Sequence, residues 1–491
     1  MSQTESKTQD KNSSEQKAPE NHQPPAPRSE VNFKKMLIAS ACGAAIALIP
    51  PPAGLTVQAM QFLGIFIFMI IGMLITAAQM WAVTNLAAML CIVLKLAPFN
   101  QVYAEFSGTT IWMLLAVVGF AGCMQESGIM KRIAFNVLKF FPPNYTGQVL
   151  ALLTACSVVN PIVPSSTAKT AMMSPLTGTI IYETGMKPHS KGAKGLWFVM
   201  HMTTSVGACL YLTGSNITLI LLGMMPADVA AEFVWGKWFL AAAPWGLPML
   251  ALVVVYVLMF LRPEEKMSMT KETMREQVKA LGPMSGDEIF CLVVLIITVA
   301  LWVTVEYHGI STTVTSWIAL LAMYARGLFS SRDVVAKFPW SIVMMFAPMM
   351  GVVALMRPIG LIDYVSSILP VDMIRSIIPN GFVFVIILAL FSFLMRFIVD
   401  SMSLIPIVVA IFGPIASILG VNIWLVLFVM WVNGMSWPLP HQGVMIMQAH
   451  AMMGHDLLEL EDVRNMSYIY SIISAVACLI AVPFWMGMGL I

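Results

Sequence analysis

Charged residues are scarce in this chain: Asp, Glu, Lys and Arg make up 11% of its 491 residues. A soluble globular domain usually carries about 25% charged residues. Hydrophobic residues reach 58%, and the mean hydropathy is +0.82. The scarcity excludes an ordinary soluble domain, and the formal net charge of +2 gives no reason to expect nucleic-acid binding. The sequence predicts an all-α protein in the lipid bilayer, with room for roughly ten crossings at about 20 residues each.

Recognisable catalytic and metal-binding motifs are also missing. The seven cysteines lie singly in apolar surroundings, without CxxC or Cys/His spacing, so neither a disulfide framework nor a metal centre is indicated. The motifs HExxH and GxSxG and a paired-aspartate metal motif do not occur. An embedded enzyme is therefore the least favoured of the functions considered.

Polar residues are concentrated in two long segments, which divide the chain. Residues 1–33 are rich in Pro, Gln, Ser and Glu and predict a disordered tail rather than a cleavable signal peptide. Residues 262–288 carry mixed charges and predict an amphipathic or soluble connecting helix. Two transmembrane halves remain, 34–261 with one extra leading helix and 289–491.

Short motifs recur between these halves at a nearly constant offset, which predicts an internal duplication. The matching pairs are Val83 with Val314 (offset 231), Gly128 with Gly360 (offset 232), Pro175 with Pro406 (offset 231) and Thr213 with Leu439 (offset 226).

The stretch NPIVPSSTAKTAMMSP, residues 160–175, interrupts the first half with prolines, hydroxyls and a lysine. Pro161 and Pro164 end one apolar arm, and Ser165, Ser166 or Thr167 can cap the next. We therefore predict a re-entrant helical hairpin whose tip presents a helix N-terminus, an anion-binding geometry to which Lys169 adds charge. The alternative is an ordinary interfacial loop with Lys169 reaching the lipid headgroups.

The matching stretch of the second half is LMRFIVDSMSLIP. Counting back from Pro406 by the repeat offset places Asp400 opposite Lys169. Arg396 and Asp400 are four residues apart and could pair on a helix. An ionisable residue within the membrane is a functional hypothesis by default, and a structural Arg396–Asp400 pair is the alternative.

Downstream of each hairpin comes a second break in helical sequence. The first, YLTGSNITL, has polar and small residues in an apolar stretch, and the second, SWPLPHQGVM, has prolines that a helix interior does not accommodate. His441 could titrate near neutral pH or serve as a hydrogen-bonded structural residue. Asn216 and Gln442 offer carbonyl oxygens, which suit a hard cation or a position next to a bound carboxylate.

These features together resemble the divalent-anion:sodium symporter family of di- and tricarboxylate transporters. VPSSTAK…MMSP resembles the first hairpin of the family, in the branch similar to oxoglutarate/malate translocators, except that Ser166 replaces an asparagine. TGSN stands where the family has its second break, and residues 106–134 are similar to its preceding segment. The second Ser-Asn-Thr motif is absent, and Arg396, Phe397 and Ile398 take its place. The resemblance covers roughly residues 60–490.

The resemblance implies a polytopic membrane protein of two inverted repeats with re-entrant hairpins, divided into a scaffold and a transport domain. It further implies a multi-pass protein of the cell (inner) membrane that forms a homodimer. Its function would be secondary active transport of a C4-dicarboxylate, oxoglutarate or citrate, cation-coupled or exchanging, with elevator-like alternating access. A cation/proton antiporter that uses Asp400 is the alternative.

The predicted site combines the hairpin tips with the breaks. No cofactor is expected besides Na⁺ or H⁺ as coupling ion, with Na⁺ at the hairpin tips. The predicted substrate-binding residues are Ser165, Ser166, Thr167, Lys169, Thr213, Gly214, Ser215, Asn216, Ser401, Ser403, Pro440, His441 and Gln442. The predicted cation-coupling residues are Asn160, Ser165, Asn216, Asp400 and Gln442. The carboxylate, the coupling ion and the absolute topology stay open.

Overall fold

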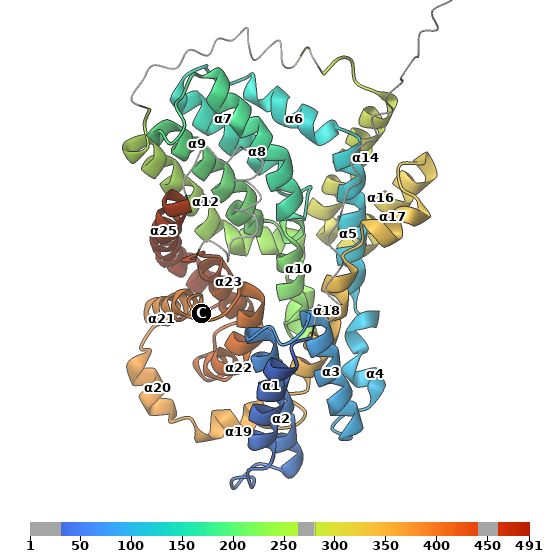
Figure 1. Ribbon diagram of the computed structural model, residues 1–491, viewed down its shortest axis with the longest axis vertical. Coiled ribbons are helices and arrows are strands. Elements are labelled where there is room, and N and C mark those ends of the chain that lie inside the picture. Colours follow the sequence, from blue (N-terminus) through green and yellow to red (C-terminus); the bar gives the residue numbers. More distant parts are fainter. Residues whose placement is uncertain (1–30, 264–278, 280, 440–459) are drawn as a thin grey trace, which may run out of the picture.

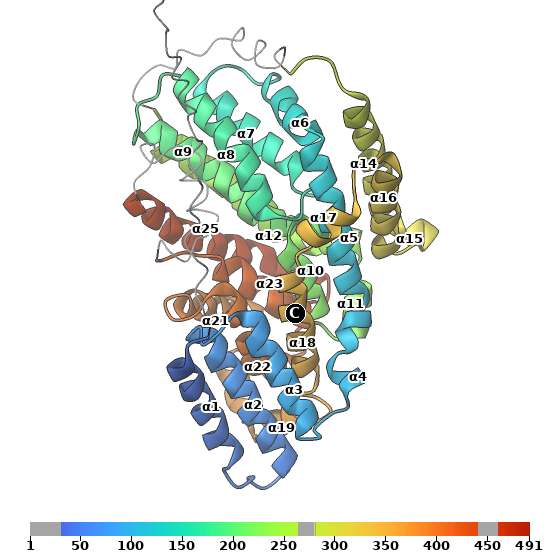
Figure 2. The same cartoon turned by 45° about the vertical axis from the view of Figure 1, so that its right-hand side comes forward.

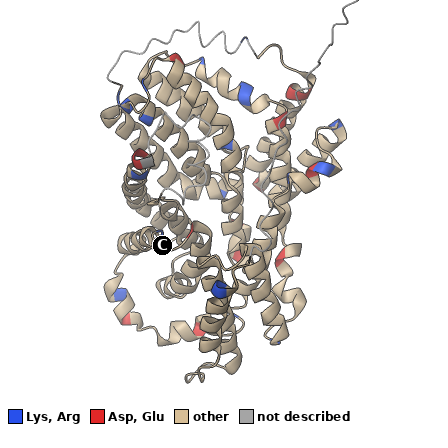
Figure 3. Cartoon of the chain, in the orientation of Figure 1, with Lys and Arg blue, Asp and Glu red and all other residues tan. Residues whose placement is uncertain are grey.

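A computed structural model describes residues 31–263, 279, 281–439 and 460–491 of the chain. All elements of this described part are helices, so the predicted all-α class is confirmed there. Six helices in it are long and apolar enough to cross a membrane by length and composition. Charged side chains are sparse among the packed helices, and many lie at helix ends (Figure 3). A polytopic membrane protein has this distribution, because the bilayer interior disfavours charge.

The first half of the chain contains twelve α-helices in the described residues. They are α1 (Phe33–Ala47), α2 (Val57–Leu74), α3 (Met80–Val93), α4 (Phe99–Val102), α5 (Thr109–Glu126), α6 (Ile129–Leu138), α7 (Tyr145–Val159), α8 (Ser166–Glu183), α9 (Lys191–His201), α10 (Asn216–Gly223), α11 (Ala227–Glu232) and α12 (Trp235–Phe260).

The second half contains eleven α-helices in its described part. They are α14 (Gly286–Val303), α15 (Val305–His308), α16 (Thr312–Arg326), α17 (Ser331–Ala336), α18 (Trp340–Ala354), α19 (Leu361–Ile368), α20 (Val371–Ile377), α21 (Gly381–Met395), α22 (Ser401–Leu419), α23 (Ile423–Gly434) and α25 (Leu460–Gly487).

Two boundaries differ from the predicted ones. Helix α1 begins at Phe33, capped by Asn32, one residue before the predicted start of the first half at 34. Helix α14 begins at Gly286 because Ser285 and Glu288 form a capping box, two residues before the predicted end of the polar connecting segment. Most of that segment lies outside the described residues.

Helices of each half pack against helices of the other half in a reciprocal arrangement (Figures 1 and 2). Helix α5 of the first half packs against α16 of the second, and α18 of the second half packs against α3 of the first. Within each half, α2 packs on α3 as α14 packs on α16. Gly128 and Gly360 have φ angles of +83° and +80° and immediately precede α6 and α19. These matched features support the internal duplication.

The hairpins have arms of unequal length. In the first, α7 has 15 residues and α8 has 18. In the second, α21 has 15 residues, whereas α22 has 19 and is apolar enough to cross a membrane by itself. Each second arm contains a proline, Pro175 in α8 and Pro406 in α22, as the repeat alignment predicts.

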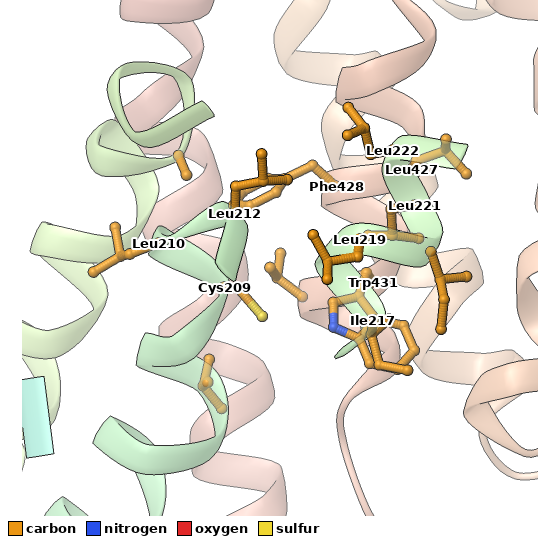
Figure 4. Packing of buried hydrophobic residues seen from close by; sticks show 14 of the residues in the cluster. Cys209, Leu210, Leu212, Ile217, Leu219, Leu221, Leu222, Leu427, Phe428 and Trp431 are labelled. Atoms are coloured by element: carbon orange, nitrogen blue, oxygen red, sulfur yellow. The ribbon is translucent and has the colours of Figure 1, made fainter. Parts of the chain in front are cut away.

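Helix α10, which follows the first break, packs against α23 of the other half (Figure 4). Leu219 and Leu221 of α10 are fully buried, as are Leu427 and Phe428 of α23 to within 1% exposure. Lipid tails are as apolar as leucine, so this packing stabilises the fold mainly through close van der Waals contact. The contact fixes the first break relative to the second half of the chain.

Candidate functional site

A cavity of about 440 Å³ lies where the tips of both hairpins meet the first helix break. In Figure 1 the α7–α8 hairpin lies in the upper part of the molecule and α22 in the lower part. Helices α3 and α18 contribute one residue each to the wall. The lining residues are Met80, Pro164, Ser165, Ser166, Thr167, His201, Ser205, Val206, Ser215, Asn216, Ile217, Ile342, Arg396, Asp400, Ser401, Met402, Trp431, Met435 and Trp437. Seven predicted site residues from three segments distant in sequence are therefore brought together.

The tip of the first hairpin presents the N-terminus of α8 to this cavity. Among the three hydroxyl residues considered as a cap, Ser165 takes the role, and its Oγ accepts a hydrogen bond from the Ala168 backbone N at 3.2 Å. Ser166 and Thr167 form the first turn of the helix and also line the cavity. The positive end of the helix dipole thus faces a cavity with hydroxyl groups on its wall.

Lys169 has a different contact from the predicted one. It is fully buried, it is absent from the cavity wall, and its Nζ donates to the Gly214 backbone oxygen at 2.7 Å. The predicted direct contact between Lys169 and a substrate is not supported by this geometry. Instead the ammonium joins the hairpin tip to the broken helix.

The first break is longer than the sequence suggests. After α9 the chain forms a π-helical turn, Met202–Val206, and two 3₁₀ turns, Gly207–Leu210 and Leu212–Gly214, before α10 begins. A side chain at Gly214 would place its Cβ 2.2 Å from the Ala208 oxygen, so only glycine fits there.

Hydrogen bonds connect this break to the hairpin tip. Thr213 Oγ1 donates to the Pro161 oxygen at 2.8 Å, and the Asn216 backbone N donates to the Pro164 oxygen at 2.9 Å. Thr213 Oγ1 also accepts from Trp235 Nε1 at 3.0 Å. Thr213 and Gly214 are therefore supporting residues outside the cavity wall, whereas Ser215 and Asn216 line it.

The tip of the second hairpin contains the two charged residues that the sequence singled out. Arg396 is the C-cap of α21, and its guanidinium donates from Nε to the Ser436 oxygen at 2.9 Å and from Nη1 to the Val399 oxygen at 2.7 Å. Asp400 is the N-cap of α22 and accepts from the backbone N of Met402 at 2.8 Å and of Ser403 at 3.2 Å. The two residues lie on opposite sides of a turn, not on one helix.

These caps correct the predicted register of the second hairpin. The proline offset placed Asp400 opposite Lys169, but Asp400 caps its helix as Ser165 caps α8. The proline is the tenth residue of α8 and the sixth of α22, so the prolines match while the helix starts differ by four residues. Ser401 lines the cavity, while Ser403 donates its hydroxyl to Asp400 and supports the cap from outside the wall.

The second break begins after α23, at Met435. Trp437 is fixed there by its backbone N, which donates to Ser467 Oγ at 2.7 Å, and by its Nε1, which donates to the Val463 oxygen at 2.9 Å. The predicted residues Pro440, His441 and Gln442 lie outside the described residues.

His201, Ser205, Trp431 and Trp437 line the cavity too, and the sequence singled out none of these polar and aromatic residues. The His201 ring stacks on Trp197, with centroids 5.0 Å apart, and meets Trp437 edge-on at 5.0 Å. Its Nδ1 lies 3.4 Å from Ser205 Oγ, one helical turn away. A histidine followed by three hydroxyl residues in HMTTS within an apolar stretch was the available signal.

Two asparagines retain an unused acceptor. Among the described residues, the side-chain oxygens of Asn160 and Asn216 are buried without a hydrogen-bond partner. Asn160 donates its Nδ2 to the Thr203 oxygen at 2.8 Å. Amide oxygens are suitable ligands for a hard cation. No group of three or more His, Cys, Asp or Glu residues that could hold a metal ion occurs in the part of the chain that the structure describes.

The model of the protein family described as "sodium:sulfate symporter transmembrane region" matches residues 30–491 of this chain. The spinach (Spinacia oleracea) protein "Dicarboxylate transporter 2, chloroplastic" is 25% identical over 327 residues, covering 65% of this chain and 58% of its own length. The spinach "Dicarboxylate transporter 1, chloroplastic" is 22% identical over 471 residues, covering 94% of this chain and 81% of its own. The solved structure of Neisseria gonorrhoeae MtrF has a TM-score of 0.56 at 14% identity, covering 91% of this chain and 97% of that one, and shows a shared fold alone.

Proposed function

Because the chain belongs to the family described as the sodium:sulfate symporter transmembrane region, we propose that it is a secondary transporter of small dicarboxylates. The membership agrees with the resemblance found in the sequence and establishes a transport protein rather than an enzyme. The names of the two spinach relatives support the dicarboxylate as substrate. The cavity of about 440 Å³ supports it too, since it lies within the roughly 300–1,000 Å³ of small-molecule sites.

A dianion suits the charges around the cavity. Arg396 lines it, and the N-termini of α8 and α22 point into it from opposite hairpins. A guanidinium and two helix N-termini supply donors for two carboxylates. We propose that one carboxylate binds at the first tip, near Ser166 and Thr167, and the other at the second tip, near Arg396.

Two side-chain cations, Lys169 and Arg396, are the main evidence for how transport is driven. Lys169 donates to the Gly214 oxygen in the first break, and Arg396 donates to the Ser436 oxygen at the second. A coupling cation dissociates after transport, but these two charges are covalently part of the chain. Each stands beside a hairpin tip, where the family resemblance leads us to expect a sodium ion. We propose that they replace bound sodium and that the protein exchanges one dicarboxylate for another.

The charge balance explains why exchange would follow. Two cations, one carboxylate on Asp400 and two helix N-termini of about +0.5 each sum to about two positive charges. A bound dianion neutralises them. An empty site would have to cross the membrane interior with this charge uncompensated, which costs several kcal/mol. Only the loaded site can cross at low cost. The site must therefore carry one dicarboxylate outward before it can carry another inward.

We also propose how the repeats are arranged and how the protein moves, assembles and is located. The reciprocal packing of α5 on α16 and of α18 on α3 supports two inverted repeats. Elevator-like movement of a transport domain against a scaffold, a homodimer and residence in the cell (inner) membrane follow from the family resemblance.

The proposed exchange is testable in proteoliposomes. Labelled succinate or malate should accumulate only when unlabelled dicarboxylate is inside, and replacing external Na⁺ by K⁺ or choline should leave the rate unchanged. Liposomes without protein are the control. Sodium-driven accumulation into liposomes that contain no dicarboxylate would contradict exchange while leaving dicarboxylate transport intact.

Sodium symport is the second candidate, because the buried oxygens of Asn160 and Asn216 lack a hydrogen-bond partner in the described structure. The same experiment decides between the two. The cation/proton antiporter has less support, since the Asp400 carboxylate accepts three hydrogen bonds as a helix cap and the named relatives are dicarboxylate transporters.

Asp400→Asn is expected to shift the preferred charge of the transported anion. Asparagine caps helices as well as aspartate does, so α22 should keep its cap while the site gains one positive charge. Transport of trivalent citrate relative to divalent succinate, measured at pH 7.5, should rise several-fold. Ser403→Ala is the matched control, because it alters the same cap without a change in charge. An unchanged citrate-to-succinate ratio in Asp400→Asn would remove Asp400 from the charge balance.

A further inference from the structure

A second cavity, of about 410 Å³, adjoins the central one. It lies between the α2–α3 turn and the start of α18, and we call it the vestibule. Its lining residues are Thr76, Ala78, Gln79, Met80, Trp81, Ser341, Ile342 and Met345. Met80 and Ile342 also line the central cavity, so these two side chains form a wall common to both.

The vestibule has a lining suited to an anion. None of its lining residues is acidic, and the exposed side chains of Gln79, Trp81 and Ser341 carry hydrogen-bond donors. Lys35 supplies a positive charge, since its Nζ lies 3.3 Å from Thr76 Oγ1 on the cavity wall.

The lysine is held at this position by the backbone. The Asn32 N–H donates to the Ala77 oxygen at 2.8 Å, which attaches the start of α1 to the α2–α3 turn. Asn32 also caps α1 by accepting from the Lys35 backbone N at 3.2 Å. Lys35 is therefore fixed beside the vestibule, whereas its neighbour Lys34 is exposed.

We propose that the vestibule is an outer subsite, which holds an anion beside Lys35 before the anion passes Met80 and Ile342 into the central cavity. The identity of that anion as a dicarboxylate rests on the proposed function. A fixed charge at the mouth of a cleft raises the local concentration of oppositely charged ligand and its rate of entry. The anion then moves from one cation, Lys35, to a second, Arg396.

The subsite can be tested without transport, by charge-selective thiol labelling of purified protein in detergent. Six native cysteines are buried and Cys42 is partly buried, so Cys42→Ala gives a low background. Gln79→Cys in that background would be treated with an anionic sulfonate and with a cationic trimethylammonium methanethiosulfonate. The ratio of anionic to cationic labelling rates should fall roughly 3- to 10-fold on adding Lys35→Gln, as expected for loss of one steering charge.

Lys34→Gln is the matched control, since it removes the same charge one residue away and should leave the ratio nearly unchanged. Succinate should slow labelling of Gln79→Cys, and it should do so less in the Lys35→Gln background. Ser341→Cys provides a second position if Gln79→Cys fails to fold. Equal ratios in the Lys34→Gln and Lys35→Gln proteins would overturn the subsite, whatever the transport assay finds.

In proteoliposomes, Lys35→Gln should raise the half-saturating succinate concentration several-fold at low ionic strength and leave the maximal exchange rate unchanged. The difference from wild type should shrink at 0.5 M salt, where exposed charges are screened. If Gln79→Cys labels as expected but the wild-type protein moves no dicarboxylate, the proposed function is refuted and an anion subsite is kept. If the wild-type protein exchanges succinate but Lys35→Gln affects neither assay, the anion subsite is refuted and the proposed function is kept.

Discussion

Replacement of Arg396 by glutamine is expected to lower dicarboxylate exchange by at least roughly 30-fold, because removing one partner of a desolvated pair between Arg396 and a substrate carboxylate costs about 2–5 kcal/mol. Arg396 lines the central cavity and is 2% exposed. Its guanidinium also orders the second tip through the carbonyls of Ser436 and Val399. Arg396→Lys should retain the charge but only part of the activity, since a single ammonium does not reproduce the planar fork of donors.

The measurement is the initial rate of labelled succinate exchange, normalised to the amount of folded protein. Arg326→Gln is a suitable control, because Arg326 forms a half-exposed ion pair with Asp287 and neither residue lines the cavity. Gel filtration and thermal unfolding in detergent separate loss of fold from loss of binding. Exchange in a folded Arg396→Gln protein at more than a tenth of the wild-type rate would contradict a substrate contact.

Lys169→Met is expected to lower exchange roughly 10- to 100-fold, because it leaves the buried Gly214 oxygen without its donor at a cost of about 1–3 kcal/mol. A second effect separates charge from structure. Removing one fixed cation lowers the charge of the empty site, so the empty site should cross the membrane more easily. Net uptake into liposomes without internal dicarboxylate should therefore rise relative to exchange.

The diagnostic quantity is the ratio of net uptake to exchange, measured on the same preparation. Lys131→Met, at an exposed lysine, is the matched control and should change neither rate. Lys169→Arg should keep the wild-type ratio even if its absolute rate falls. If Lys169→Met lowers both rates in proportion, the lysine supports the tip structurally and the charge argument for exchange fails.

The parts of the site that sequence predicted well depend on local chemistry. Proline, glycine and hydroxyl residues favour helix ends, so the tip of the first hairpin and the helix break after it could be located from the amino-acid sequence. Ser165 as cap and Ser215 and Asn216 on the cavity wall follow from that pattern.

The parts that sequence missed depend on contacts between distant residues. Lys169 was expected to face a substrate, but its partner is the carbonyl of a residue 45 positions away. The prolines predict that Asp400 lies opposite Lys169, whereas the helix starts in the two hairpins differ by four residues. His201 and Trp437 meet only in the folded chain, and among so many apolar residues no periodicity marks which aromatic faces a cavity.

The reciprocal packing of the halves has a consequence for biosynthesis. Helix α5 begins at Thr109 and its partner α16 at Thr312, so 203 residues (312 − 109) separate their appearance. At about 5–20 residues per second, α5 waits in the membrane for roughly 10–40 s before α16 is made. The contact between α5 and α16 therefore forms only after α16 has left the ribosome.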